Sequence, residues 1–340
     1  MNILFVSPVG WGALKQRHQG FAKELMGKGH QVFFLNPILS GGFSVTVHAE
    51  SITTVTVKTP FKASSHPWLQ KYAVKLALNM VLKRCHLKHE ETVLWLAEPS
   101  CAAMTDYRWF RIIYDCCDLH GSFPGQKADV WLFYEKLISD RADCIIVSHP
   151  YIKQHFNESV CQKCVVIPNA TSFTTSIRKG KPSENEPLKL LSSGAHYEWI
   201  DMTWLRMLAE QENLELHIAG NGRGREFEEL LAMKNVIFHG ALEQQDLLRI
   251  MAECHVGLVP FKNIELVKGV DPIKIYDYAA TGLEIWAPDI EALHSNVYIT
   301  HFVKNNKDVR LAISAYGAIK KPDLINKIPT WHNRLSNFRI

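Results

Sequence analysis

Lys274 stands near the start of a predicted helix, in the stretch VDPIKIYDYAATG at residues 270–282. We expect Asp271 to be the N-cap and Pro272 the first helical residue, where a missing N–H costs nothing. Gly282 is a typical helix end. Lys274 then occupies the third position, facing the positive end of the helix dipole, at a cost of about 0.3–1 kcal/mol if exposed. A lysine at this position therefore needs a compensating role.

Two glycine-rich segments follow predicted strands: GWGALK, at residues 10–15, and GNGRGR, at residues 220–225. A dinucleotide-binding fingerprint needs glycine in the sixth place, which Lys15 and Arg225 occupy instead. Both segments still offer a turn between strand and helix, where exposed N–H groups can hold phosphate. A tight turn without a ligand fits either segment equally well.

The cysteines and histidines show no metal-binding pattern. The pair Cys161 and Cys164 lacks a second CxxC, and the strand-like CVVIP follows it, so neither zinc nor redox chemistry is expected. Cys116 and Cys117 are expected at a buried strand end, and the 16 histidines contain no HExxH. Eight cysteines in mostly apolar contexts are typical of reduced thiols, which favours a cytoplasmic location.

Short apolar runs alternate with helical segments along the whole chain. NILFVS, QVFFLN, TVLWLA, RIIYDC, DCIIVS and CVVIP form a first set, and LKLLSSG, LELHIAG, NVIFHG, HVGLVPF and LEIWAP a second. This rhythm predicts an α/β protein with two doubly wound, Rossmann-like domains of largely parallel sheet. We place them at residues 1–171 and 188–325, joined by a linker at 172–187. A ligand is expected outside the strand C-termini, in the cleft between the domains.

Positive charge is concentrated in the first domain. The net charge is +4, but residues 1–171 carry +5 (18 basic minus 13 acidic) and the rest −1 (20 minus 21). Residues 51–89 contain seven basic residues and no acidic one, and residues 66–89 read as a helix. Such a helix either docks on its own domain with a solvated face or lies on an anionic membrane surface. No apolar run has the ~20 residues of a membrane span, and the N-terminus has no basic leader typical of a signal peptide.

Taken together, these segments resemble a GT-B glycosyltransferase, most like the family-4-type (group 1) enzymes of bacterial polysaccharide synthesis. The resemblance covers nearly the whole chain and is carried by the order and spacing of several motifs. They are PVGWGALKQRHQGFAKELMGKGHQVFFLNP, RIIYDCCDLHGSFPG, EKLISDRADCIIVSHPYIKQHF, VVIPNAT, SSGAHYEWID, LHIAGNG, VIFHGALEQQDLLRIMAECHVGLVPF and DPIKIYDYAATGLEIWAP. IPTWHNRLSNF, within residues 326–340, looks like the C-terminal helix that crosses back to the first domain in this fold.

The resemblance implies that the second domain binds a nucleotide-sugar donor and the first an acceptor. Lys274 would then add a cation to the helix N-terminus to bind a diphosphate and offset the charge on the leaving group. Asp277, one turn further on, would hold the ribose hydroxyls where the family usually has a glutamate. The alternative is an ordinary surface pair of Asp277 with Lys274. The other donor-site candidates are Gly194, Gly220, Asn221, Gly222, Arg223 and Phe261.

The sequence departs from the family pattern at two places. Gly269 occupies the position of a first glutamate, eight residues before Asp277, and Glu265 is out of register. The loop GAHYEWID lacks the usual Arg/Lys pair for the diphosphate, for which Arg223 is a possible substitute. Retaining and inverting chemistry therefore both stay open.

In the first domain, Asp115, Asp118 and His120 follow a predicted strand. Asp118 is our first choice for the base that an inverting enzyme needs, or alternatively caps the next turn. His120 is a candidate sugar contact and Asp115 a structural residue. Gly10, Gly12, Arg17 and Gln19 are candidates for the acceptor side of the cleft, although the last two would equally well face solvent.

The sequence predicts a cytoplasmic glycosyltransferase, with possible peripheral membrane contact, that needs no metal or other cofactor. The expected donor is a UDP-sugar, then a GDP-sugar, and the expected acceptor a glycan or polyprenyl-linked glycan of the cell envelope or an exopolysaccharide. Two alternatives remain: a non-catalytic sugar-nucleotide-binding partner of an active transferase, which Gly269 favours, and a nucleotide-sugar epimerase. A nucleic-acid partner is not expected, because the basic stretch lacks interleaved aromatic residues.

Overall fold

The computed structural model describes residues 1–12, 16–49, 52–173, 182–183, 186–317 and 328–340. The chain divides into two compact units. Unit 1 comprises Met1–Pro168, Gly269–Asp271 and Arg334–Ile340, and unit 2 comprises Asn169–Lys268 and Pro272–Asn333. Most of the predicted linker, residues 172–187, lies outside the described residues.

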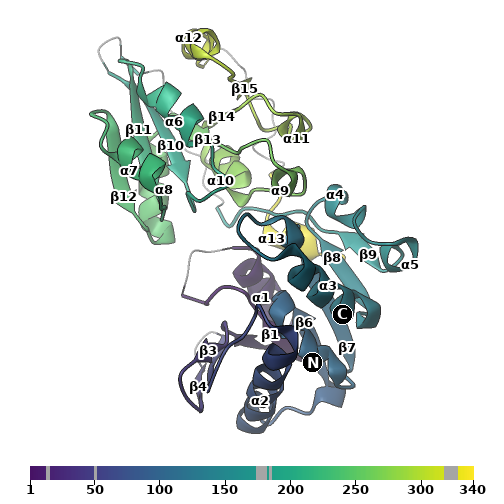
Figure 1. Cartoon of the computed structure of the whole chain (residues 1–340). Helices are drawn as coiled ribbons and strands as arrows, with labels where there is room; N and C mark the ends of the chain where they lie inside the picture. Colours follow the sequence, from purple (N-terminus) through teal and green to yellow (C-terminus); the bar gives the residue numbers. More distant parts are fainter. Residues whose placement is uncertain (13–15, 50–51, 174–181, 184–185, 318–327) are drawn as a thin grey trace. The chain divides into compact units, whose positions relative to one another are not determined.

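Unit 1 is built on a nine-stranded sheet in the order β3-β5-β2-β1-β6-β7-β8-β9, with β4 antiparallel to β5 and every other pairing parallel (Figure 1). Residues of β6 and β8 are buried along their whole length, as expected for parallel strands covered on both faces. The strands are β1 (Asn2–Val6), β2 (Gln31–Leu35), β3 (Leu39–Ser40), β4 (Ser44–Ala49), β5 (Thr53–Thr59), β6 (Thr92–Leu96), β7 (Arg111–Cys116), β8 (Cys144–Val147) and β9 (Cys164–Val166).

Helices of unit 1 connect parallel strands of its sheet in βα units. α1 begins with a capping box in which the side chains of Gln16 and Gln19 each bond the other's backbone N–H. The elements are α1 (Arg17–Gly27), α2 (Pro67–Cys85), the 3-10 turns η1 (His89–Glu91), η2 (Pro99–Asp106) and η3 (His120–Ser122), α3 (Ala128–Arg141), α4 (Pro150–Lys153) and α5 (Glu158–Cys161).

Unit 2 is built on a six-stranded, fully parallel sheet in the order β12-β11-β10-β13-β14-β15. The strands are β10 (Leu188–Ser193), β11 (Leu214–Ala219), β12 (Val236–Gly240), β13 (Val256–Leu258), β14 (Glu284–Ala287) and β15 (His301–Phe302). The helices are α6 (Met202–Ala209), α7 (Arg225–Leu231), α8 (Gln244–Glu253), α9 (Glu265–Lys268), α10 (Ile273–Thr281), α11 (Glu291–His294) and α12 (Asn306–Ala315). Both predicted sets of strands are therefore present, one in each unit.

Two predicted helix boundaries need correction. The N-cap of α10 is Pro272, not Asp271, so Lys274 is the second helical residue instead of the third. The reason is that Pro272 has an extended ψ of 120°, which keeps it outside the helix. The expected C-terminal helix is the single short helix α13 (Trp331–Leu335), within the described part of residues 326–340.

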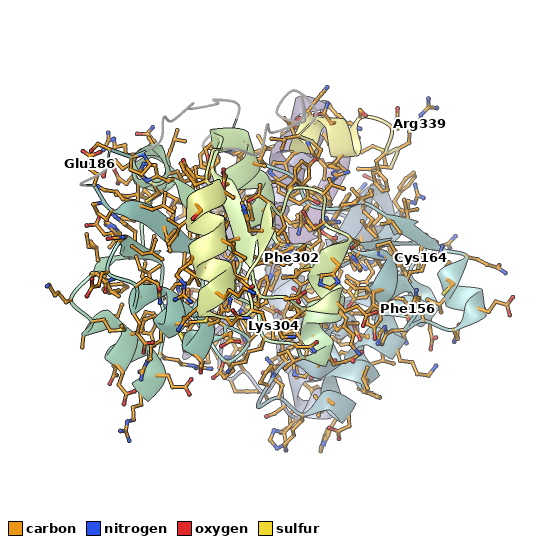
Figure 2. The ribbon with its side chains drawn as sticks, turned by 90° about the horizontal axis from the view of Figure 1, so that it is seen from above. Phe156, Cys164, Glu186, Phe302, Lys304 and Arg339 are labelled. Carbon is orange, nitrogen blue, oxygen red and sulfur yellow. The ribbon has the colours of Figure 1, made fainter. Side chains whose placement is uncertain are left out.

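The predicted state of the cysteines agrees with their surroundings. All eight are free thiols. The Cys161 thiol donates to the carbonyl oxygens of Lys153 and Phe156 at 3.1 and 3.3 Å. The Cys164 thiol donates to the carbonyl oxygen of Val160 at 3.5 Å. Phe156 and Cys164 are labelled in Figure 2. Within the described ranges, no helix combines the length and the apolar character needed to cross a bilayer.

Candidate functional site

In unit 2, Tyr278 holds the helix α10 against the end of strand β10. Its hydroxyl accepts a hydrogen bond from the backbone N–H of Ser193 at 2.9 Å and lies 2.8 Å from Ser193 Oγ. Gly257 in β13 makes room for the ring, because a Cβ at that position would collide with it. The N-terminus of α10 is thereby fixed beside the carboxyl ends of β10 and β13, the edge where parallel α/β sheets bind ligands.

Lys274 lies at this helix N-terminus without an anionic partner among the described residues. A methyl group at Gly194 would be 3.6 Å from its Nζ, and the ring centre of the buried Phe261 lies 5.5 Å away. Burial lowers the pKa of Lys274 to about 8. The backbone N–H groups of the first turn of α10 receive no side-chain cap from Pro272. A cation and uncapped N–H groups together favour an anion.

His196 is the buried neighbour of this cation. Its Nε2 lies 2.8 Å from Ser192 Oγ, and its backbone N–H donates to the carbonyl oxygen of Asn221 at 2.7 Å. Burial, with the charge of Lys274 adding to it, lowers the pKa of His196 to about 3. His196 is therefore neutral at physiological pH, and Lys274 carries the positive charge at this edge.

The two glycine turns of unit 2 lie against each other. Gly194 and Gly220 have φ angles of 104° and 127°, which favour glycine. A Cβ on Gly220 would also collide with the carbonyl oxygen of Gly194, and one on Gly222 with the ring of Phe227. The predicted glycine-rich turns are thus required by backbone conformation and close approach. The N–H groups of Gly194 and Gly220 already donate to the carbonyl oxygens of Ala219 and Gly240, at 2.8 and 2.6 Å.

The contacts of Arg223 are with Glu198 and Tyr197 and not with Lys274. Its guanidinium bonds Glu198 at 2.7 Å and lies 5.0 Å from the ring centre of Tyr197. Arg223, Glu198 and Tyr197 line a pocket of about 420 Å³ in unit 2, together with Phe227 and Lys262. To bind a diphosphate, the guanidinium of Arg223 would have to leave Glu198. Because this ion pair is exposed, breaking it costs little stability.

Asp277 is not the exposed partner of Lys274 considered above. Its Oδ1 instead accepts a hydrogen bond from the hydroxyl of Thr171 at 2.7 Å. Burial raises the pKa of Asp277 to about 7, against the opposing effect of the Thr171 hydrogen bond. The carboxyl group is therefore partly protonated near neutral pH.

In unit 1, the structure corrects the prediction that Arg17 and Gln19 contact an acceptor or solvent. Arg17 is 2% exposed; its Nε donates to Asp115 Oδ1 at 2.8 Å and its Nη1 to the carbonyl oxygen of Ile167 at 2.7 Å. Gln19 is 1% exposed and donates to the carbonyl oxygen of Gly10 at 3.0 Å. Arg17 therefore joins distant segments of the unit, whereas Gln19 holds the nearby loop at Gly10. Asp115 has the expected structural role.

Asp118 lies two residues after the end of β7. It does not cap the following turn, whose N-cap is Leu119 without a side-chain hydrogen bond. Its Oδ2 accepts a contact from the thiol of Cys117 at 3.5 Å. Burial raises the pKa of Asp118, although the charge of His120 opposes this effect. A carboxyl group with a raised pKa beside an imidazole suits proton transfer.

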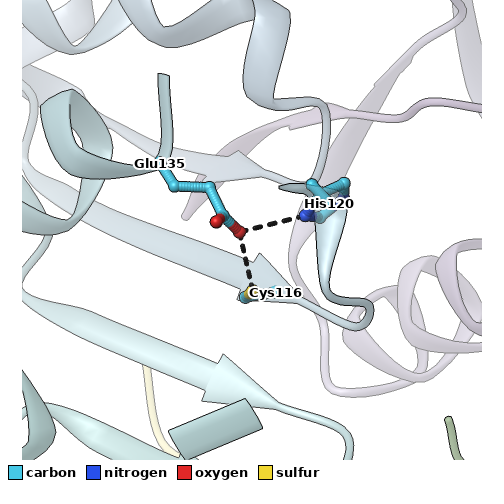
Figure 3. Close-up of side chains that lie close together, drawn as sticks. All are labelled: Cys116, His120 and Glu135. Carbon is cyan, nitrogen blue, oxygen red and sulfur yellow. Dashed lines mark hydrogen bonds and ion pairs between the residues drawn. The ribbon is translucent and has the colours of Figure 1, made fainter. Parts of the chain in front are cut away.

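His120 belongs to a cluster that sequence reasoning did not identify. Its Nδ1 lies 3.1 Å from Glu135 Oε1, which also accepts from the Cys116 thiol at 3.3 Å (Figure 3). The ligand atoms of these three residues lie within 4.8 Å of one another, so the trio could hold a metal ion. That the protein works without a metal ion stays a prediction. Glu135 lies within a quoted motif, but only the fold brings it to His120.

The remaining candidates lie in loops. Gly12 and Asn221 are exposed, and Gly10 is half-buried. Gly269 is in unit 1, and a Cβ added there would meet the side chains of Ile152 and Leu119 at 3.1 Å, so a glutamate would require these two side chains to shift. Glu265 instead pairs with Lys268 at 2.7 Å. Sequence reasoning missed Thr171, His196 and Tyr278; only Tyr278 had a local signal, its position one turn after Lys274.

A search with known family models finds no match to this chain. TuaH of Bacillus subtilis (strain 168), named as a candidate teichuronic acid biosynthesis glycosyltransferase, is 24% identical over 216 residues, which cover 57% of this chain and 54% of that protein. The chain thus matches about half the length of this curated relative.

Solved structures match over nearly the whole chain. Sucrose-phosphate synthase from Thermosynechococcus elongatus has a TM-score of 0.66 at 15% identity, covering 99% of this chain and 92% of that one. The galactosyltransferase WaaB of the lipopolysaccharide outer core has 0.60 at 14%, covering 99% and 98%. An E. coli structure described as trehalose-6-phosphate bound with UDP-2-fluoro glucose has 0.62 at 11%, with the same coverage. The two largely parallel sheets, their connections and these likenesses show that the chain has the GT-B fold of glycosyltransferases.

Proposed function

We propose that this protein is a glycosyltransferase that moves a sugar from a nucleotide-sugar, a UDP-sugar before a GDP-sugar, to a glycan or polyprenyl-linked acceptor in cell-envelope or exopolysaccharide synthesis. The observation that carries the proposal is Lys274, a cation without an anionic partner among the described residues, at the uncapped N-terminus of α10. The GT-B fold and the likeness to TuaH support it.

The diphosphate would bind Lys274 and the N–H groups at the start of α10, and the glycine turns at residues 194 and 220–222 would allow its close approach because they carry no side chains. As the bond to the leaving group breaks, Lys274 and the helix dipole stabilise the growing negative charge, the work that a metal ion does elsewhere. Asp277 would accept hydrogen bonds from the ribose hydroxyls. In unit 1, Asp118 would take the acceptor proton in an inverting reaction, and His120 would contact the sugar.

The test is ligand binding by Lys274→Ala beside a matched control. Lys307 is also the second residue of a helix, α12, but there the Asn305 side chain already caps the N–H groups of residues 307 and 308. We expect Lys274→Ala to weaken binding of UDP or GDP by about tenfold or more, while uridine or guanosine binding changes little. Lys307→Ala should leave both unchanged. Equal losses for nucleoside and diphosphate would contradict the anion site.

A panel of nucleotide-sugars in a thermal-shift assay, followed by turnover assays, separates the alternatives, because a ligand that binds only the native state raises its melting temperature. Slow hydrolysis of the donor, or transfer to an acceptor, fits a transferase. An epimerised sugar would show the epimerase alternative, and binding without turnover in any acceptor screen would show a non-catalytic partner.

We also propose that unit 1 contacts an anionic membrane surface through a basic-aromatic face of α2, defined as the exposed residues Trp68, Lys71 and Tyr72, which lie three and four positions apart on one side of the helix. Trp68 and Tyr72 are 69% and 61% exposed and contact each other with ring centres 6.2 Å apart. Aromatic rings flanked by lysines suit the interface between headgroups and acyl chains. Asp106 accepts ion pairs from Lys71, Lys75 and Arg141, so three positive charges and one negative charge leave this group at +2.

This contact is tested by sedimentation with vesicles of neutral lipid and of neutral lipid containing phosphatidylglycerol. We expect binding only to the anionic vesicles, reduced strongly by a double variant with Trp68→Ser and Tyr72→Ser. Leu311→Ser, which removes a 59% exposed apolar residue of α12, is the control and should bind as the original protein does. Equal behaviour of the double variant and the control would refute the membrane face.

A further inference from the structure

The imidazole of His120 is held through one nitrogen only. Nδ1 lies 3.1 Å from Glu135 Oε1, whereas Nε2 makes no hydrogen bond within the described residues and retains solvent access. The side chain of His120 is 12% exposed. Trp131, one turn before Glu135 on α3, stacks on the imidazole with ring centres 6.2 Å apart and an interplanar angle of 19°. The ring is therefore fixed in its plane, with Nε2 as its exposed atom.

The carboxylate that holds His120 is itself held by strand β7. Tyr114 and Cys116, two residues apart and thus on the same face of β7, donate to Glu135 Oε1 at 3.1 and 3.3 Å. Burial raises the pKa of both the phenol and the thiol well above their ordinary values, so both groups keep their protons and act as donors. Three donors from two elements therefore converge on one oxygen atom of Glu135.

The charged groups around His120 mostly favour its protonation. Burial alone lowers the pKa of His120, but the hydrogen bond and charge of Glu135, with the carboxylates of Asp118 and Glu98, outweigh it and raise the pKa above 6.5. In return, burial would raise the pKa of Glu135, yet the contact with His120, assisted by Cys116 and Tyr114, lowers it. His18 also faces the cluster, but burial lowers its pKa to about 4, so it is neutral.

A carboxylate on one imidazole nitrogen fixes the tautomer and the direction of the other nitrogen. We propose that Glu135 is the positioning residue of the proposed transferase: by accepting from Nδ1–H it holds His120 so that Nε2 hydrogen-bonds a hydroxyl group of the sugar substrate. The inference rests on the proposed function, since it names the partner of a residue of that same site. Glu135 itself does not touch the substrate.

The first test measures the His120 pKa by NMR and needs no activity. The His120→Gln spectrum identifies the His120 signal among the 16 histidines. We expect the pKa to lie above 6.5 in the original protein and to fall clearly in Glu135→Gln. The matched control is Glu90→Gln, because Glu90 pairs with His89 at 3.2 Å but is 58% exposed; it should leave the His120 pKa unchanged. A pKa below 6.5 in the original protein, or no change in Glu135→Gln, would overturn the proposal.

The second test uses turnover with a donor that the binding panel identifies. We expect Glu135→Gln to lower kcat by roughly tenfold or more while KM for the donor changes less, and to shift the limb of the pH–rate profile that follows His120 to lower pH. Tyr114→Phe removes one donor to Glu135 and should give an intermediate effect. A purely structural Glu135 would lower the melting temperature and leave the pH profile unchanged. A stoichiometric metal ion bound by Cys116, His120 and Glu135 would also overturn the proposal. If no donor reacts, the proposed function is refuted instead. The NMR measurement of the His120 pKa then decides whether Glu135 positions His120.

Discussion

The hydroxyl group of Tyr278 accepts a hydrogen bond from the backbone N–H of Ser193, 2.9 Å away, and so joins the second turn of α10 to the end of β10. The two residues are 85 positions apart. This bond fixes the distance between the N-terminus of α10 and the glycine turn that begins at Gly194. The proposed diphosphate site depends on that distance, because its two sides come from these two segments.

Tyr278→Phe tests this dependence. We expect the variant to lose about 1–3 kcal/mol of folding stability, since the buried N–H of Ser193 loses its acceptor, and to bind UDP or GDP several-fold more weakly. Urea unfolding and calorimetry measure the two effects. Tyr107→Phe, which removes a hydroxyl that bonds Asn79 in unit 1, is the control and should leave nucleotide affinity unchanged. Unchanged nucleotide affinity in Tyr278→Phe would show that the site does not depend on this bond.

The affinity for a nucleoside diphosphate should depend on pH through Lys274. Burial lowers the pKa of Lys274 to about 8 in the free protein, so the ammonium form that binds diphosphate is lost as the pH rises from about 8. We expect the dissociation constant for UDP or GDP to increase between pH 7 and pH 9.5, with uptake of a proton on binding. Calorimetry in buffers of different ionisation enthalpy measures both. Lys274→Met should bind weakly with a flat profile; an equally steep profile in that variant would assign the effect to another group.

Asp277 should make folding stability fall with rising pH. Its pKa is raised by burial from 3.8 to about 7, so the folded state binds more protons than the unfolded state between these values, and stability decreases across that window. Asp277→Asn keeps an oxygen acceptor for Thr171 and removes the titration. We therefore expect its melting temperature, relative to the original protein, to be higher at pH 8 than at pH 4, as calorimetry would show. A constant difference across this range would contradict the prediction.

The buried pair of Arg17 and Asp115 should matter for folding more than for donor binding. Arg17→Met leaves a carboxylate without its partner in a fully buried place, for which the expected loss is about 3–5 kcal/mol of unfolding free energy. Denaturant unfolding measures this loss. Lys136→Met breaks an exposed i,i+4 pair with Asp140 and should cost less than about 0.5 kcal/mol. A selective loss of acceptor turnover in stable Arg17→Met protein would restore Arg17 as an acceptor contact.

Local features of the sequence were sufficient for the fold class and for part of the donor-side site. Parallel strands buried on both faces are continuous apolar runs, so β1, β6 and β8 are visible without any tertiary information. Glycines with positive φ after β10 and β11 are visible because only glycine readily adopts that conformation. The helix with Lys274 in its first turn was also predictable, although its start was misplaced by one residue because the proline before it adopts an extended backbone.

The partners of charged side chains were decided only by the tertiary structure. Arg17 lies on a helix whose spacing is compatible with exposure, yet it is buried on Asp115, 98 residues away. Glu135 and His120, like Asp277 and Thr171, meet because separate elements pack together. The apolar periodicity of a segment determines whether it forms a helix or a strand, since it reflects which face is buried. Which ion or hydrogen-bond donor a buried carboxylate meets depends on the register between elements distant in the chain, and no local pattern records it.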